Sequence, residues 1–176
     1  MSQLRAAVAS ALHFVTEPGV VVGLVPWLLT RWQVETLPSY WFPLRGLGAV
    51  AACLGVVVIG RQFVRFVVEG EGSPAPVVPT ERLVVGGLYR WVRNPMYVAV
   101  ITAIFGQALW FGSPRLAVYG LVMAGLFVAF VRWYEEPALA RQHGSAYDEY
   151  RRRVPAWIPR RRALESAGTV GEPGRS

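Results

Sequence analysis

The stretch NPMYVAVITAIFGQALWFGSPRLAVYGLVMAGLFVAFVRWYEE, residues 94–136, decides the fold of this 176-residue chain. It contains two uncharged apolar runs, residues 94–111 and 116–131. A bilayer core about 30 Å thick needs roughly 20 helical residues, so both runs are candidate transmembrane helices. Only Arg115 and the Gly-Ser-Pro sequence at residues 112–114 lie between them. So short a connection predicts a tight antiparallel hairpin whose two open ends lie together.

Two more apolar segments precede this hairpin, at residues 6–30 and 41–66. The sequence therefore predicts an all-α, polytopic integral membrane protein with about four transmembrane helices. Glu17 and Pro18 interrupt the first segment, and they are compatible with a kink, a helix end or a re-entrant break.

The composition supports the membrane class. Apolar residues make up 53% of the chain and charged residues 16%, which excludes a disordered protein. The formal net charge is +7 and every basic residue is Arg, yet these Arg residues flank apolar blocks, as in membrane proteins, and do not suggest nucleic-acid binding. With one cysteine, Cys53, and two distant histidines, no metal site is expected.

The distribution of arginine predicts the orientation. With four spans, 15 of the 18 Arg residues fall on the side that holds both termini. The positive-inside rule then places both termini in the cytoplasm of a multi-pass protein of the cell inner membrane. We expect one domain over residues 1–162 and a disordered polar end at residues 163–176. In the tail we expect a helix from Pro137, a break at Gly144 and a second helix to Arg153.

Two polar groups flank the predicted hairpin. Asn94 and Pro95 suit the N-cap and first turn of a helix, and such an N-terminus can also bind an anionic group. Glu135 and Glu136 follow the last span, where adjacent carboxylates are costly unless they form ion pairs or bind a cation. Pairing with Arg90, Arg93 or Arg132 would be a purely structural explanation. Because the hairpin brings both groups to one end, the sequence predicts a site there.

These residues resemble a known family, the membrane methyltransferases, which include isoprenylcysteine carboxyl methyltransferases and phosphatidylethanolamine N-methyltransferases. The first part of the resemblance is Gly87-x-Tyr89-x-x-x-Arg93-Asn94-Pro95-x-Tyr97, followed later by Glu135-Glu136. The second part is the tail pattern Gly144-x-x-Tyr147-x-x-Tyr150-x-x-x-Val154-Pro155-x-x-Ile158-Pro159, which is similar to the carboxyl methyltransferase branch. The resemblance covers roughly residues 44–159.

The resemblance implies S-adenosylmethionine as the methyl donor and a lipophilic small molecule or lipid as the acceptor. It implies a donor-binding site built from Leu83, Val84, Tyr89, Asn94, Pro95, Met96, Tyr97 and Glu135. A family arginine acts near the substrate, and Arg132 is the nearest match here. If the acceptor is an amine or a thiol, a proton acceptor is needed, and Glu136 is the candidate.

One departure leaves the branch open. Asn94 stands where the carboxyl methyltransferases usually have histidine, and the runs around Asn94 and Glu135 look more like the phospholipid N-methyltransferases. Gly46 and Gly48 also resemble a glycine pair of that branch, although helix packing is the simpler explanation. The alternatives are therefore methylation of a phospholipid headgroup or, in another class, a non-catalytic membrane scaffold or transporter subunit.

Overall fold

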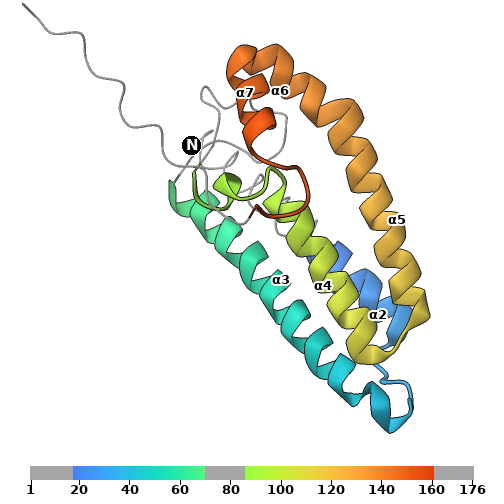
Figure 1. Ribbon diagram of the computed structural model, residues 1–176. Coiled ribbons are helices and arrows are strands. Elements are labelled where there is room, and N and C mark those ends of the chain that lie inside the picture. Colours follow the sequence, from blue (N-terminus) through green and yellow to red (C-terminus); the bar gives the residue numbers. More distant parts are fainter. Residues whose placement is uncertain (1–17, 70–85, 161–176) are drawn as a thin grey trace, which may run out of the picture.

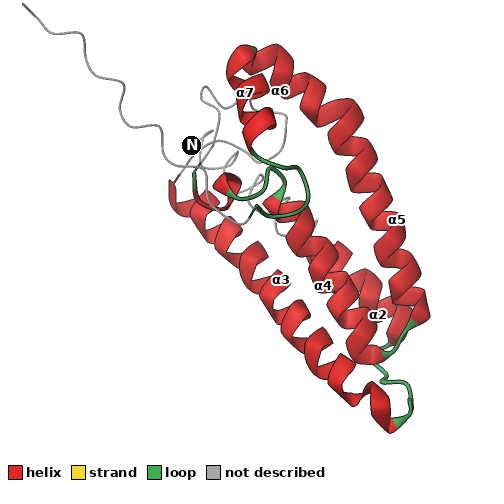
Figure 2. Ribbon diagram, in the orientation of Figure 1, coloured by secondary structure: helices red, strands yellow, loops and turns green. Residues whose placement is uncertain are grey.

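The computed structural model describes residues 18–69 and 86–160 of the chain. Every regular element within these ranges is helical, which confirms the all-α prediction (Figures 1 and 2). Three long helices, α3 (Phe42–Glu69), α4 (Pro95–Phe111) and α5 (Pro114–Phe130), run in alternating directions (Figure 1). A shorter helix, α2 (Val25–Thr30), follows a π-helical turn, Gly19–Leu24, and packs near the α4–α5 turn.

The predicted hairpin between α4 and α5 is confirmed. Gly112 ends α4 in the left-handed conformation, with φ of 68°, which favours glycine. Ser113 caps α5 by accepting a hydrogen bond from the Leu116 amide at 3.4 Å, and Pro114 opens the first turn of that helix. A Cβ atom at Gly112 would also collide with the side chain of Leu37. The backbone angle therefore favours glycine in this turn, and a larger residue would also have to displace the Leu37 side chain.

Small residues let α3 and α4 approach each other closely. A Cβ atom on Gly48 would lie 2.7 Å from the carbonyl oxygen of Gly106, and one on Gly55 would lie 2.6 Å from that of Ala99. No described atom lies within 4 Å of a Cβ atom built on Gly46. The packing role expected of the glycine pair is thus confirmed for Gly48, and close contact between backbones is a common way for membrane helices to associate.

The first described helix contains Pro26, which is buried and cannot donate a backbone hydrogen bond. The carbonyls of Val22 and Val21 would otherwise receive α- or π-type hydrogen bonds from residue 26. Side chains of the hairpin bind them instead. Gln107 Nε2 donates to Val22 O at 2.9 Å, and the Tyr119 hydroxyl donates to Val21 O at 3.0 Å. These two bonds join α4 and α5 to the N-terminal helical segment.

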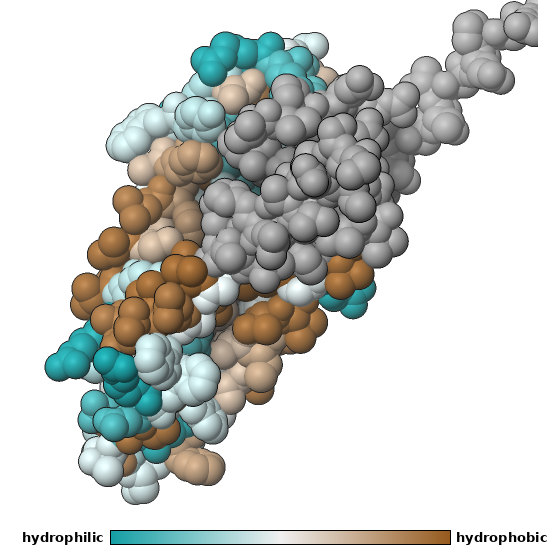
Figure 3. All heavy atoms as spheres, turned by 180° about the vertical axis from the view of Figure 1, so that it is seen from behind, coloured by the Kyte–Doolittle hydropathy of each residue, from teal (hydrophilic) through white to brown (hydrophobic). Residues whose placement is uncertain are grey.

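Two helices in the described part of the chain are long and apolar enough to cross a membrane, Ser39–Gln62 and Pro114–His143. The apolar helices Gly19–Thr30 and Pro95–Phe111 are shorter, so the four predicted spans remain a prediction. Apolar side chains are exposed on the outer face of α5, among them Val118, Leu121 and Val122. Figure 3 shows apolar side chains in the middle of the visible face, with polar ones toward its ends.

The last long helix differs from the prediction at its C-terminal end. It was expected to end near residue 131, but it continues through a π-helical turn, η4 (Val131–Glu135), into α6 (Glu136–His143). Pro137 explains the turn, because it cannot donate to the carbonyl of Trp133, and the Glu136 amide bonds to Val131 O in a wider turn. The break at Gly144 and the following helix α7 (Ser145–Arg153) are confirmed. The first part of the first predicted span, residues 6–17, and the polar end at 163–176 lie outside the described residues.

Candidate active site

The start of α4 is bound to the C-terminal tail by backbone hydrogen bonds. The Arg93 amide donates to Pro155 O at 2.9 Å, and the Asn94 amide donates to Ala156 O at 3.3 Å. Asn94 occupies the N-cap position, as expected, but its side-chain Nδ2 also donates to Ala156 O, at 3.2 Å. The side chain makes no capping hydrogen bond to α4. Asn94 instead fixes the tail across the beginning of α4.

Tyr97 and Glu135 connect the two predicted polar groups. The Tyr97 hydroxyl donates to Glu135 Oε2 at 3.2 Å, joining the first turn of α4 to the π-helical turn after α5. The Tyr97 ring lies 4.8 Å from the Phe127 ring and 6.5 Å from the Trp157 ring, measured between centroids. A carboxylate thus lies beside a group of aromatic rings at the end of the hairpin where the sequence predicted a site.

Glu136 lies at the centre of an ion-pair cluster. The residue is 7% exposed, and its Oε1 accepts a hydrogen bond from Arg93 Nη1 at 2.8 Å. Its Oε2 lies 3.4 Å from Arg151 Nη2 and 3.6 Å from Arg132 Nη1. Arg93 also donates to the Tyr147 hydroxyl at 3.2 Å. The cluster joins the residues before α4, the π-helical turn and α7 through one buried carboxylate.

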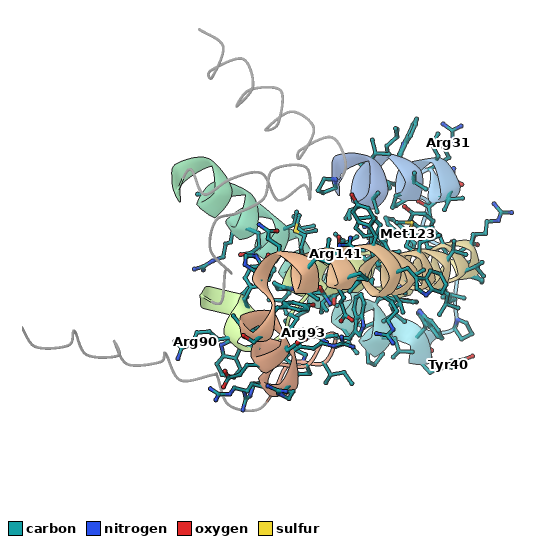
Figure 4. The ribbon with its side chains drawn as sticks, turned by 90° about the horizontal axis from the view of Figure 1, so that it is seen from above. Arg31, Tyr40, Arg90, Arg93, Met123 and Arg141 are labelled. Carbon is teal, nitrogen blue, oxygen red and sulfur yellow. The ribbon has the colours of Figure 1, made fainter. Side chains whose placement is uncertain are left out.

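The remaining predicted residues divide into three groups. Tyr89 lies in a 3₁₀ turn, Gly87–Arg90, beside the tail, while Pro95 is buried and Met96 half-buried in the first turn of α4. Arg132 lies on the π-helical turn with a largely exposed side chain. Leu83 and Val84 lie outside the described residues. Figure 4 shows Arg93 beside the tail helices, while Arg31 and Tyr40 lie at the far end of the bundle.

The structure adds tail residues to which the sequence analysis gave no role. Tyr147 and Tyr150 are both buried, and they lie three residues apart on one face of α7. Burial raises the pKa of the Tyr147 hydroxyl and, more strongly, that of Tyr150, so both remain protonated at neutral pH. Their spacing in the tail pattern was the available signal, but the contacts depend on how the tail folds back.

The charges of this end favour binding of an anionic group. Three guanidinium groups, those of Arg93, Arg132 and Arg151, surround Glu136, with Glu135 as its neighbour in the sequence. Positive charge therefore exceeds negative charge by one among these five side chains. In the part of the chain that the structure describes, no group of three or more His, Cys, Asp or Glu side chains could hold a metal ion. The arrangement suits a ligand bound by hydrogen bonds, ion pairs and aromatic contacts.

Comparison with known proteins supplies the family. The profile of the phospholipid methyltransferase family matches residues 47–146, which include α4, α5 and the π-helical turn. The chain belongs to this family. Its members are methyltransferases, so the resemblance to membrane methyltransferases found in the sequence is confirmed, and the chain is assigned to that class of enzyme.

Several curated proteins are similar to this chain over most of the chain's length. Protein-S-isoprenylcysteine O-methyltransferase B of Arabidopsis thaliana is 24% identical over 155 residues, covering 88% of this chain and 72% of the relative. Methanethiol S-methyltransferase of Crocosphaera subtropica is 27% identical over 143 residues, covering 74% and 51%. A nickel-cobalt-cadmium resistance protein of Alcaligenes xylosoxydans xylosoxydans is 32% identical over 119 residues, covering 66% and 52%. The chain thus spans about half the length of the last two relatives.

Proposed function

We propose that this protein transfers a methyl group from S-adenosylmethionine to a lipophilic small molecule or lipid at the cytoplasmic face of the membrane. The observation that carries the proposal is the hydrogen bond between Tyr97 and Glu135, which brings the two polar ends of the α4–α5 hairpin together beside aromatic rings. The excess of arginine at the same end supports the cytoplasmic location.

The residues at this end fit the chemistry of the proposed donor. When bound, S-adenosylmethionine supplies a methyl group on a positively charged sulfonium, and the transfer requires alignment of the methyl group with the acceptor. Glu135 would bind the ribose hydroxyls or the ammonium group. A carboxylate has about four lone-pair positions, so one bond from Tyr97 leaves capacity for such donors. Aromatic faces such as those of Tyr97 and Trp157 attract cations and pack on flat rings.

The other proposed donor-binding residues lie in the first turn of α4 or in the chain leading to it. Asn94, Pro95 and Met96 form the first turn of α4, next to Tyr97. Tyr89 precedes them in the 3₁₀ turn. We retain Leu83 and Val84 in the proposal from the family resemblance alone, because they lie outside the described residues.

We assign a positioning role to Glu136 in preference to that of a general base. Its carboxylate is buried and already bound by Arg93, and Arg151 and Arg132 lie within 3.6 Å of it. Its bond to Arg93 instead fixes the segment that enters α4. Arg132, whose side chain is 63% exposed, can reorient toward an acceptor and remains our candidate substrate-binding arginine.

The names of the relatives suggest more than one class of methyl acceptor, and two classes are candidates for this chain. An isoprenylcysteine carboxylate is anionic at neutral pH and requires no general base, and the excess of arginine charge favours such a group. Methylation of a phospholipid headgroup amine is the second candidate, supported by Asn94 in place of the histidine of the carboxyl branch.

A labelling experiment tests the proposal and separates these acceptors. The purified protein would be incubated with methyl-labelled S-adenosylmethionine and a membrane lipid extract, and the lipid-soluble product would be identified. Label released as methanol by mild base identifies a carboxyl ester, and label stable to base identifies an N-methyl group. Absence of lipid-soluble label, in protein shown to be folded, would contradict the proposed function and favour a scaffold.

A further inference from the structure

The C-terminal helix α7 contacts the turn that carries Tyr89. Tyr150 is 7% exposed, and its hydroxyl donates to the carbonyl oxygen of Tyr89 at 2.8 Å. Val154, which is fully buried, and the ring of Tyr147 pack with Tyr150 in one hydrophobic cluster. The hydroxyl is therefore held in place by the packing of its own ring.

The Tyr89 carbonyl accepts a hydrogen bond from this hydroxyl, while the backbone amides that could close a turn on it donate elsewhere. The Val92 amide donates to Leu88 O at 3.2 Å, and the Arg93 amide donates to Pro155 O at 2.9 Å. Tyr150 supplies the hydrogen bond that the local backbone does not.

The rest of the turn is held by contacts that do not involve Tyr150. The Tyr89 amide donates to Gly86 O at 3.2 Å, and the Trp91 amide donates to Leu88 O at 2.9 Å. The Arg160 amide donates to Trp91 O at 3.0 Å. Loss of the Tyr150 hydroxyl should thus change the position of Tyr89 and leave the surrounding chain folded.

We propose that Tyr150 is a positioning residue for methyl-donor binding, acting through its hydrogen bond to the backbone of Tyr89. The inference rests on the proposed function, in which Tyr89 contacts the donor. It also assigns a role in donor binding to the C-terminal tail. The tail helix fixes one wall of the donor site, so the tail contributes to donor affinity although Tyr150 itself does not touch the donor.

The test is the Tyr150→Phe variant, which removes the hydroxyl and keeps the ring in the cluster. We expect the KM for S-adenosylmethionine to rise about 3- to 10-fold, the loss typical of one hydrogen bond, with kcat within about twofold of the unchanged protein. The matched control is Tyr40→Phe, because Tyr40 is 74% exposed at the far end of the bundle (Figure 4). The control should leave KM, kcat and the melting temperature unchanged.

A second measurement needs no turnover and tests directly whether the hydroxyl holds the Tyr89 turn in place. Hydrogen exchange of the donor-free protein should be faster at residues 89–92 in Tyr150→Phe, and unchanged in the interior of α4. Faster exchange together with an unchanged KM would overturn the positioning role, as would a lower melting temperature and kcat at constant KM. If the unchanged protein neither binds nor uses the donor, the proposed function fails and this inference fails with it, whatever the exchange shows.

Discussion

Replacing Glu136 by glutamine tests the buried ion-pair cluster. The strongest bond is to Arg93, because both side chains are nearly buried, 11% exposed for Arg93 and 9% for Glu136. Removing one partner of a buried pair typically costs about 3–5 kcal/mol. Glutamine retains an oxygen acceptor, so we expect a decrease of about 2–4 kcal/mol in the free energy of unfolding. Arg151 and Arg132 are 41% and 63% exposed, and each adds at most about 1 kcal/mol.

The assay is reversible unfolding in mixed detergent micelles, with Glu149→Gln as the matched control. Glu149 pairs with Arg153 four residues along the same helix, and both side chains are more than half exposed. This control should cost at most about 0.5 kcal/mol. In the double variant with Arg93→Gln the two losses should be less than additive, because each substitution removes the same interaction. Equal stability of Glu136→Gln and Glu149→Gln would refute the argument that this cluster holds the site together.

Three other predictions concern donor binding, packing and orientation. Glu135→Gln should weaken binding of S-adenosylmethionine by roughly 10- to 150-fold in isothermal titration, and lower stability with unchanged affinity would move the contact elsewhere. Gln107→Leu leaves the Val22 carbonyl without its side-chain donor and should cost about 1–3 kcal/mol of unfolding free energy; a cost near zero would mean that another group binds this carbonyl. A reporter fused after Ser176 should be cytoplasmic, and a signal from the opposite side would contradict the predicted topology.

Local signals in the sequence predicted the elements and the place where they meet. The Gly-Ser-Pro turn and the similar lengths of the two apolar runs were enough to bring Asn94 and Glu135 to one end of the hairpin. Pro137 predicts a helix start, and α6 does begin next to it, at Glu136, but the sequence does not show that a π-helical turn joins α6 directly to α5. The bond from Asn94 to Ala156 joins residues 62 positions apart, and no local pattern specifies it.

The contacts of Glu136 are a second case in which a partner distant in the sequence could not be predicted. The sequence offered Arg90, Arg93 and Arg132 as partners because these lie near the ends of the apolar runs. The structure gives Arg93 and Arg132, together with Arg151 from α7. Arg151 was not predictable, because its position depends on the reversal of the chain at Gly144, where φ is 53°.

The two carbonyls that receive no backbone hydrogen bond from Pro26 affect when the N-terminal helical segment can enter the membrane during synthesis. Their donors, Gln107 and Tyr119, lie 85 and 98 residues farther along the chain than the carbonyls they bind. Polar groups without partners are costly in hydrocarbon, and a ribosome adds roughly 5–20 residues per second. The N-terminal helical segment is thus made several seconds before the groups that complete it. We expect this segment to remain in a polar environment during synthesis, inside the translocon or at the membrane surface, and to enter the bundle only after the hairpin has been inserted.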